Sequence, residues 1–371
     1  MYNICCFQAN TTGKGYYRIY LPYSTLGSIS RDFAVTIVPL TNLMQFTNMS
    51  YWKDFDCFVL HGFMPKAPGL ILDFMRAAKR LKKLVIYDVD DLEWEVPKEN
   101  PQYQRYKVSG FEKLFIDAMQ LSDYITTTTD ILANEVRQYH KNVVVFPNGI
   151  DYDYYFWNLP KRKNDGYIRV GYIGGSSHLH DLLEIKGIGK WLLKNYPNAK
   201  FVLGGYDYQI RGADGFLWYS DNEQSIWYQY RQVLFEDMAE SDRVEIRHSK
   251  IVERYPEIFE DLDILLAPLK NTKFNKCKSE LKLIEASARK LPVIASDIGI
   301  YGSVIKSRVN GLLVENKLSD WRRAIKKLIG DKELRQRLGN NLYETFKRKY
   351  DIKIISKKRE EWLKSILERK E

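Results

Sequence analysis

The chain has no run of about 18 apolar residues, and its first residues, MYNICCFQAN, lack the basic start and apolar core of a secretory leader. These absences predict no transmembrane segment and favour a cytoplasmic protein with at most peripheral membrane contact. Cysteine is also scarce: the spacing of Cys5, Cys6, Cys57 and Cys277 fits neither a metal site nor a disulfide framework. We therefore expect a reducing compartment and exclude the disulfide-rich secreted class.

Positive charge is in excess, but it is not concentrated in the way typical of nucleic-acid-binding proteins. The net charge is +10, yet residues 1–150 contain 16 Lys and Arg against 15 Asp and Glu. The dense patch of that half, RAAKRLKK at 76–83, reads as a solvated helix face or as a contact to a membrane or a phosphate backbone. A dedicated nucleic-acid binder more often shows a basic stripe with interleaved aromatic residues. The charge still keeps an anionic acceptor or surface among the candidate partners.

Short apolar runs alternate with amphipathic stretches along the 371 residues, which predicts two domains of α/β architecture with parallel sheets. In the first half we expect strands at 2–7, 33–39, 56–61, 83–89, 124–129 and 142–147, and helices at 68–82, 109–121 and 130–140. In the second half we expect strands at 168–174, 199–205, 243–247, 263–269, 292–296 and 311–315. Its expected helices are 181–195, 224–240, 253–261, 279–290 and 317–329, followed by a helical tail broken around KYDIK.

The stretch between the two halves reads as a linker, because PNGID is a turn signal and NLPKRKNDGY is polar. We therefore expect Rossmann-like domains at 1–150 and 168–350, joined by a linker at 151–167. Open parallel sheets bind ligands outside the carboxyl ends of their strands. The layout thus predicts a ligand cleft between the two sheets.

A glycine turn follows the first expected strand of the second half, in GYIGGSSHLHDL at 171–182. Gly174 and Gly175 would let backbone amides approach an anion, and the helix start would add a partial positive charge. Asp181 or a nearby serine is available as the N-cap. A tight turn from strand to helix needs glycine in any case, so the pattern alone leaves ligand binding open.

A second glycine turn occupies the equivalent place in the first half, in TTGKGYYRIYLP at 11–22. Gly13 and Gly15 flank Lys14, and Arg18 would project from the first helical turn. The turn lacks the third glycine of G-x-G-x-x-G, and neither glycine turn resembles a P-loop. A Rossmann-type dehydrogenase is therefore disfavoured.

Polar residues also follow two other expected strands of the first half. His61 ends the strand DCFVLH, and Asp88, Asp90 and Asp91 lie at the end of KLVIYDV and directly after it. The histidine is either structural or catalytic. The carboxylates could hold a divalent cation, position an acceptor hydroxyl or cap the next element.

The stretch KSELKLIEASARKLPVIAS at 278–296 predicts a helix that begins near Ser279 and runs into a buried strand. Lys278 and Lys282 would lie near the helix N-terminus, where unpaired amides favour anions. Glu285 would lie two turns beyond Lys278 on the same side. This combination suits a nucleoside diphosphate, with the carboxylate on the ribose hydroxyls. The simpler reading is an amphipathic helix with solvated lysines and a Lys282–Glu285 pair.

With these residues the sequence resembles the retaining GT-B glycosyltransferases of family 4, the glycosyl transferases group 1 domain. The resemblance rests on FPNGID, RVGYIGGSSHLHDL, DILLAPL, LIEASARKLPVIASDIG and NGLLVE, in that order. It implies a GT-B fold with a nucleotide-sugar donor on the second domain and an acceptor on the first. It also implies that the last helix, 351–371, crosses back to the first domain.

Glu285 matches the second glutamate of the family's E-x7-E motif, which binds ribose. Cys277 stands where the first glutamate would fall, and Glu280 is out of register, so Lys278 and Lys282 would supply charge instead. His61 matches a histidine near the transferred sugar. We expect donor binding by Gly13, Gly15, Gly174, Gly175, Ser176, His178, Lys278, Ser279 and Glu285, and catalytic roles for His61, Lys282 and Asp91.

The resulting hypothesis is transfer of a sugar from a nucleoside-diphosphate sugar, with UDP- or GDP-sugars favoured, to a hydroxyl acceptor with retention. No metal and no tightly bound cofactor is expected. The acceptor class stays open between a glycan, a lipid-linked glycan, a protein and a modified DNA base. Two other classes also stay open: a sugar-nucleotide epimerase of the same architecture and a nonenzymatic nucleic-acid-binding protein.

Overall fold

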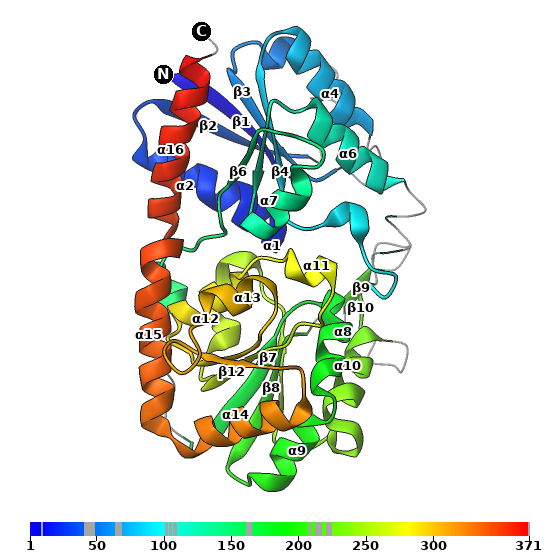
Figure 1. Ribbon diagram of the computed structural model, residues 1–371, viewed down its shortest axis with the longest axis vertical. Helices are drawn as coiled ribbons and strands as arrows, with labels where there is room; N and C mark the ends of the chain where they lie inside the picture. The colour runs from blue at the N-terminus through cyan, green and yellow to red at the C-terminus, as the bar shows by residue number, and fades with distance from the viewer. Residues whose placement is uncertain are drawn as a thin grey trace. The chain divides into compact units, whose positions relative to one another are not determined.

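The computed structural model describes residues 1–8, 10–40, 49–63, 69–100, 103, 106, 110–160, 165–206, 209–211, 217–219 and 225–369. Residues 161–164 of the expected linker lie outside this set. The chain forms two compact units (Figure 1). Unit 1 comprises Met1–Tyr152, Lys276–Leu281 and Arg348–Glu371, and unit 2 comprises Asp153–Asn275 and Lys282–Lys347. Each unit is therefore built from separate segments of the chain.

Unit 1 contains a six-stranded parallel sheet of order β2-β1-β3-β4-β5-β6. Its strands are β1 Tyr2–Gln8, β2 Phe33–Pro39, β3 Cys57–His61, β4 Leu84–Val89, β5 Tyr124–Thr127 and β6 Val143–Val145. Its α-helices are α1 Gly13–Gly15, α2 Leu21–Ile29, α4 Gly69–Arg80, α6 Phe111–Leu121, α7 Asp130–Val136 and α16 Ile352–Glu368. A π-helical segment, Tyr16–Tyr20, joins α1 to α2, and 3₁₀ turns span Met49–Trp52 and Glu93–Glu95.

The last helix of the chain completes the core of unit 1. Leu363, Ile366 and Leu367 of α16 pack with residues of β1, β3, β4 and α2 in one buried cluster. The Ser356 hydroxyl donates to the Pro22 carbonyl at 3.1 Å, and the buried Arg359 guanidinium lies over an aromatic ring of α2. The core therefore joins residues from the two ends of the chain.

Unit 2 repeats the design, with a parallel sheet of order β11-β8-β7-β12-β13-β14. Its strands are β7 Ile168–Ile173, β8 Ala199–Tyr206, β11 Val244–His248, β12 Ile264–Ala267, β13 Val293–Ser296 and β14 Leu312–Val314, with a hairpin of β9 Gln209–Arg211 and β10 Leu217–Tyr219. Its main helices are α8 Leu179–Leu182, α9 Ile188–Asn195, α10 Ile226–Phe235, α13 Gly299–Val304 and α14 Leu318–Gly330. Helices α11 Lys273–Lys276, α12 Leu281–Ala288 and α15 Lys332–Tyr350 lie at the points where the chain passes between the units.

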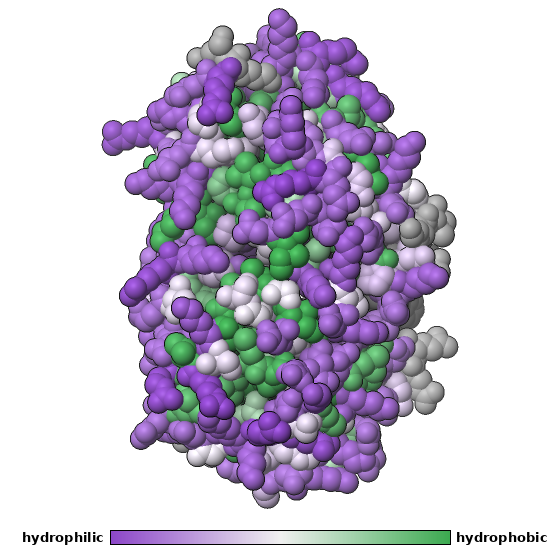
Figure 2. Space-filling model, in the orientation of Figure 1, coloured by the Kyte–Doolittle hydropathy of each residue, from purple (hydrophilic) through white to green (hydrophobic). Residues whose placement is uncertain are grey.

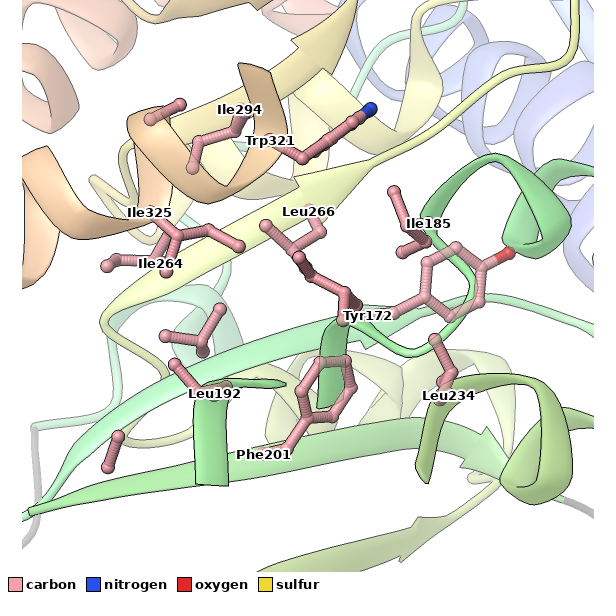
Figure 3. Packing of buried hydrophobic residues seen from close by; sticks show 14 of the residues in the cluster. Tyr172, Ile185, Leu192, Phe201, Leu234, Ile264, Leu266, Ile294, Trp321 and Ile325 are labelled. Carbon is pink, nitrogen blue, oxygen red and sulfur yellow. The ribbon is translucent and has the colours of Figure 1, made fainter. Parts of the chain in front are cut away.

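Apolar side chains from the strands and the covering helices of unit 2 form one core (Figure 3). The cluster drawn there includes Tyr172, Ile185, Leu192, Phe201, Leu234, Ile264, Leu266, Ile294, Trp321 and Ile325. Strand β12 is buried at every residue. Burial on both faces explains why the strands of a parallel sheet read as continuous apolar runs.

The expected α/β class with two parallel sheets is confirmed, and each expected strand is present within two residues at either end. Two helix predictions are wrong in detail. The helix expected at 181–195 is interrupted at Gly187, whose φ of 72° ends one turn and starts α9. The helix expected at 253–261 is a 3₁₀ segment, Val252–Phe259, that contains Pro256. Proline lacks the backbone N–H that an α-helix would use there.

The third correction concerns the start of the chain. The turn expected around Gly13 and Gly15 is helical from Gly13 onward and continues through the π-helical segment into α2.

Among the described residues, no helix is both long enough and apolar enough to cross a membrane.

Candidate functional site

Both sheets place their predicted site residues at the point where the strand order reverses. In unit 1 the reversal lies between β1 and β3, which are followed by Lys14 and end at His61, respectively. In unit 2 it lies between β7 and β12, which are followed by Gly174 and the loop before α11. Crossovers leave in opposite directions at such a point, and the carboxyl ends of the strands there form the usual ligand site of open α/β sheets.

Lys14 is the centre of an ionic cluster in unit 1. Its ammonium group lies 2.9 Å from Asp91 Oδ2, 2.9 Å from Glu93 Oε1 and 3.4 Å from Asp90 Oδ1. Burial alone would lower the pKa of Lys14, but the three carboxylates outweigh burial and raise it well above its usual value. Lys14 therefore stays charged and gathers the acidic residues that follow β4.

The cluster also takes in His61, which is 3% exposed. Its Nε2 lies 3.3 Å from Asp90 Oδ1. Burial disfavours the imidazolium, but the hydrogen bond and charge of Asp90 outweigh it, so the pKa of His61 is raised and that of Asp90 is lowered. The other ring nitrogen, Nδ1, is buried and has no hydrogen-bond partner among the described residues. The structure thus brings His61, Asp90 and Asp91 together around Lys14.

Beneath this cluster lies a fully buried ion pair between Arg18 and Asp88. Arg18 Nε and Nη2 donate to the two Asp88 carboxylate oxygens at 2.9 and 2.8 Å. Arg18 Nη1 donates to the Phe146 carbonyl at 2.8 Å and to Asn148 Oδ1 at 3.1 Å. Asp88 therefore supports the sheet edge and is not available to a ligand.

The metal alternative finds no support in this arrangement. No group of three or more His, Cys, Asp or Glu side chains within the described ranges is placed to hold a metal ion. Asp90 and Asp91 bind Lys14 instead, and Glu93, whose pKa is raised by burial, also accepts from the Tyr106 hydroxyl at 2.9 Å.

In unit 2, the turn after β7 is held by side chains from elsewhere in the unit. Tyr230 accepts from the His178 backbone N–H at 2.8 Å and donates from its hydroxyl to the Gly175 carbonyl at 3.0 Å. His178 ends a 3₁₀ turn that begins at Ser176. Asp181 does not cap the helix as expected. Its carboxylate lies 2.7 Å from His178 Nδ1 and accepts from the Lys270 backbone N–H at 2.9 Å.

Lys282 approaches the same turn from α12. Its ammonium group donates to the Ile173 carbonyl and lies 4.2 Å from the centre of the Tyr172 ring. The Tyr172 hydroxyl is buried and has no hydrogen-bond partner among the described residues. An ammonium group, an unsatisfied hydroxyl and a glycine backbone thus meet at the carboxyl end of β7. This arrangement can bind a phosphate or another anion.

The other predicted residues of the stretch 278–296 lie differently. Helix α12 begins at Leu281, so Lys278 and Ser279 precede it and belong to the segment Lys276–Leu281 of unit 1. The Ser279 hydroxyl accepts from Asn148 Nδ2 at 2.9 Å within that unit. The helix therefore begins two residues later than expected, with Lys278 before its first residue and Lys282 directly after it.

Glu285 is 5% exposed and lies inside α12. Its charge adds to burial in raising the pKa of Tyr255, which places the carboxylate near the 3₁₀ segment Val252–Phe259. The simpler reading of a solvated helix face is excluded for this residue.

Gly174 leaves no room for a larger residue. A Cβ atom there would lie 2.6 Å from the Tyr172 hydroxyl and 2.9 Å from Lys282 Nζ, whereas a Cβ on Gly175 would meet no heavy atom within 4 Å. We expect Gly174→Ala to lower the free energy of unfolding by about 1–3 kcal/mol through overpacking. Gly175→Ala is the matched control and should change it by less than about 0.5 kcal/mol. Urea unfolding of both variants measures the difference, and equal losses would contradict the crowded geometry.

Comparison with known proteins finds a family whose model matches part of this chain. Residues 192–345 match the family described as glycosyl transferases group 1. We call these matched residues the group 1 segment. The group 1 segment includes α12 with Lys282 and Glu285 and ends in α15, and the glycine turn lies upstream of it.

Individual known proteins are similar to this chain in sequence or in fold. A D-inositol 3-phosphate glycosyltransferase of Nocardia farcinica is 29% identical over 104 residues, which are 28% of this chain and 22% of that protein. The matched region is thus under a quarter of the relative's length. Sucrose-phosphate synthase from Thermosynechococcus elongatus has a TM-score of 0.70 at 13% identity over the whole of both chains. Anabaena Alr3699/HepE, solved with UDP and glucose, has a TM-score of 0.68 at 15% identity, over 98% of this chain and all of that one. These structures confirm the expected fold class.

Several residues around Lys14 in unit 1 and around the turn after β7 in unit 2 were not identified by the sequence analysis. Glu93 lies in the acidic run after β4, which could have signalled it. Tyr172, Tyr230 and Asn275 gave no such signal, because their partners are distant in sequence, and Asp181 was expected as a helix cap. Asn275 Nδ2, for instance, donates to Asp181 Oδ1 at 2.7 Å across 94 positions.

Proposed function

We propose that this chain is a glycosyltransferase that moves a sugar from a nucleoside-diphosphate sugar to a hydroxyl acceptor, with retention at the anomeric carbon. The observation that supports this most is the meeting of Lys282, the Tyr172 hydroxyl and Gly174 at the carboxyl end of β7. Lys282 lies in the group 1 segment, and the position is a strand-order reversal.

The chemistry needed is stabilisation of the departing diphosphate. Lys282 would supply positive charge, and the backbone amides of Gly175 and Ser176 would donate hydrogen bonds to phosphate oxygens. His178, oriented by Asp181, would contact the same group. Glu285 would accept from the ribose hydroxyls. These groups are fixed by packing before the donor arrives, so little reorganisation is needed as charge develops.

Unit 1 would supply the groups around the acceptor. His61 would orient the transferred sugar, and Asp91 would accept a hydrogen bond from the acceptor hydroxyl. The carboxylates of Asp90, Asp91 and Glu93 outnumber the Lys14 cation they surround. His61, whose pKa is raised by Asp90 against the effect of burial, adds positive charge to this edge, so we propose no charge for the acceptor.

We propose a UDP-sugar as the donor, because solved structures of this fold carry UDP and glucose or UDP-glucose. The reaction would need no metal, since positive side chains occupy the place of a cation. We place it in the cytoplasm, in keeping with four buried thiols, two of which, Cys5 and Cys6, have pKa values raised by burial.

The test is a thermal-shift series with UDP-, GDP-, dTDP- and ADP-glucose, followed by product analysis with and without an acceptor. Ligand at 100 times its Kd stabilises the folded state by about 2.7 kcal/mol, so a specific donor raises Tm measurably. We expect UDP-glucose to give the largest shift and Glu285→Ala to reduce it. No shift with any nucleotide, or epimerised donor without transfer, would overturn the proposal.

A further inference from the structure

The junction of α15 and α16 concentrates positive charge in unit 1. Residues 348–359, RKYDIKIISKKR, contain six basic residues and one acidic residue. The acidic residue, Asp351, is 7% exposed and caps α16, accepting from the Lys353 backbone N–H at 2.9 Å. The one negative charge of the segment is therefore turned inward, while the cations outside the core remain on the surface.

Helix α16 carries its exposed cations and its core residues on opposite sides. Ile352 and Ile355 are buried, and Arg359 is buried against the rings of Tyr23 and Phe146. Lys353, Lys357 and Lys358 are exposed and lie on the opposite side of the helix. We call the exposed residues Arg348, Lys349, Lys353, Lys357 and Lys358 the basic face.

Acidic side chains offset part of the basic face. Glu280 interacts with Lys349, and Glu360 and Glu361 lie three and four residues after Lys357, on the same side of α16. Lys353 lies 3.6 Å from Asp151 Oδ1, with both side chains partly exposed. Lys349 lies 4.9 Å from the centre of the Tyr350 ring. The cations of the basic face remain exposed, and hydrophilic side chains project from the edge along which α16 runs (Figure 2).

We propose that the basic face docks the protein on an anionic lipid bilayer. Clusters of four to eight Lys or Arg on an amphipathic helix are attracted to anionic headgroups, each residue contributing within a Debye length of the surface. Ile354, 39% exposed between the cations, offers an apolar side chain to the headgroup region. The apolar side of α16 packs in the core of unit 1. The helix would therefore contact the bilayer through its exposed side and stay packed against unit 1.

A bilayer fits this face better than a nucleic acid. Non-specific nucleic-acid surfaces combine positive charge with exposed aromatic side chains on which bases stack. The aromatic residue of α16, Trp362, instead packs against Tyr124 and Phe146. The Trp362 ring therefore stabilises unit 1 and is not a stacking surface for bases.

The experiment is co-sedimentation of the full chain with vesicles of phosphatidylcholine alone and with vesicles that also contain phosphatidylglycerol. We expect binding to the anionic vesicles that weakens as salt rises. Lys353→Gln/Lys357→Gln/Lys358→Gln should weaken partitioning about 100-fold, from about 1 kcal/mol per basic residue near an anionic surface. The matched control, Lys326→Gln/Lys327→Gln/Lys332→Gln, removes the same charge from exposed positions of α14 and α15 and should bind like the unaltered chain.

Equal binding to both vesicle types, or equal losses in the two triple variants, would overturn the proposal. So would binding of a DNA or RNA oligonucleotide, but not of anionic vesicles, that is lost in the α16 variant. Thermal denaturation of each variant shows that it is folded. The thermal shift with UDP-glucose reports separately on the proposed function, because the basic face lies outside the donor site.

Discussion

Replacing Lys282 with alanine is expected to lower kcat for sugar transfer by about 100- to 1,000-fold, the usual cost of removing one group that stabilises charge in a transition state. The ammonium group lies against the Ile173 carbonyl and the Tyr172 ring, at the carboxyl end of β7. Negative charge on the leaving diphosphate would develop there. Initial rates of transfer from UDP-glucose, with saturating donor, measure the change.

The control for this variant is Lys276→Ala, which removes an exposed lysine from α11. It should leave kcat within about twofold, since surface substitutions away from a site have small effects. Because Lys282 also contacts the backbone and a ring, urea unfolding of both variants separates lost stability from lost catalysis. A folded Lys282→Ala enzyme with unchanged kcat would refute the assignment of Lys282 to the leaving group.

Arg18→Met is expected to lower the free energy of unfolding by about 3–5 kcal/mol, because it leaves the Asp88 carboxylate buried without its partner. Both side chains are essentially inaccessible, at 1% and 0% exposure. The change also removes the donors to the Phe146 carbonyl and to Asn148. Urea-induced unfolding followed by circular dichroism measures the loss.

Two comparisons make this result specific. The double variant Arg18→Met/Asp88→Leu should recover part of the loss, because it removes the unpaired charge as well. Lys364→Ala breaks a pair with Asp32 at 2.8 Å, where each side chain is about half exposed, and should lower the free energy of unfolding far less than Arg18→Met does. If Arg18→Met cost no more than Lys364→Ala, the buried pair would not contribute as inferred.

The sheets were predictable because their strands are buried on both faces. A strand such as β3 or β12 then reads as an unbroken apolar run. The alternation of such runs with amphipathic stretches indicates the α/β class. The helix break at Gly187 and the 3₁₀ segment at Pro256 each depend on one residue inside an otherwise periodic pattern. Amphipathic periodicity averages over such residues, so it gives the element and misses its interruption.

The candidate site was predictable in position more than in detail. The carboxyl ends of neighbouring parallel strands share an edge of the sheet, so His61 after β3 and Asp90 and Asp91 after β4 could be grouped from sequence. Lys14, the partner of Asp90 and Asp91, lies more than 70 positions away from them, and Lys282 is 109 positions from the carbonyl that it contacts. Which of the many lysines reaches which carboxylate depends on packing between distant segments, and periodicity carries no such information.

The place of α16 in the core of unit 1 has a consequence for biosynthesis. Leu363, Ile366 and Leu367, which cover part of the apolar surface of residues 1–152, are synthesised after the segments that form unit 2. At about 5–20 residues per second, the intervening chain takes roughly 10–40 s to translate. During that interval the nascent first sheet carries an uncovered apolar face, which makes it a natural client for ribosome-associated chaperones. Unit 2 can fold before α16 is synthesised.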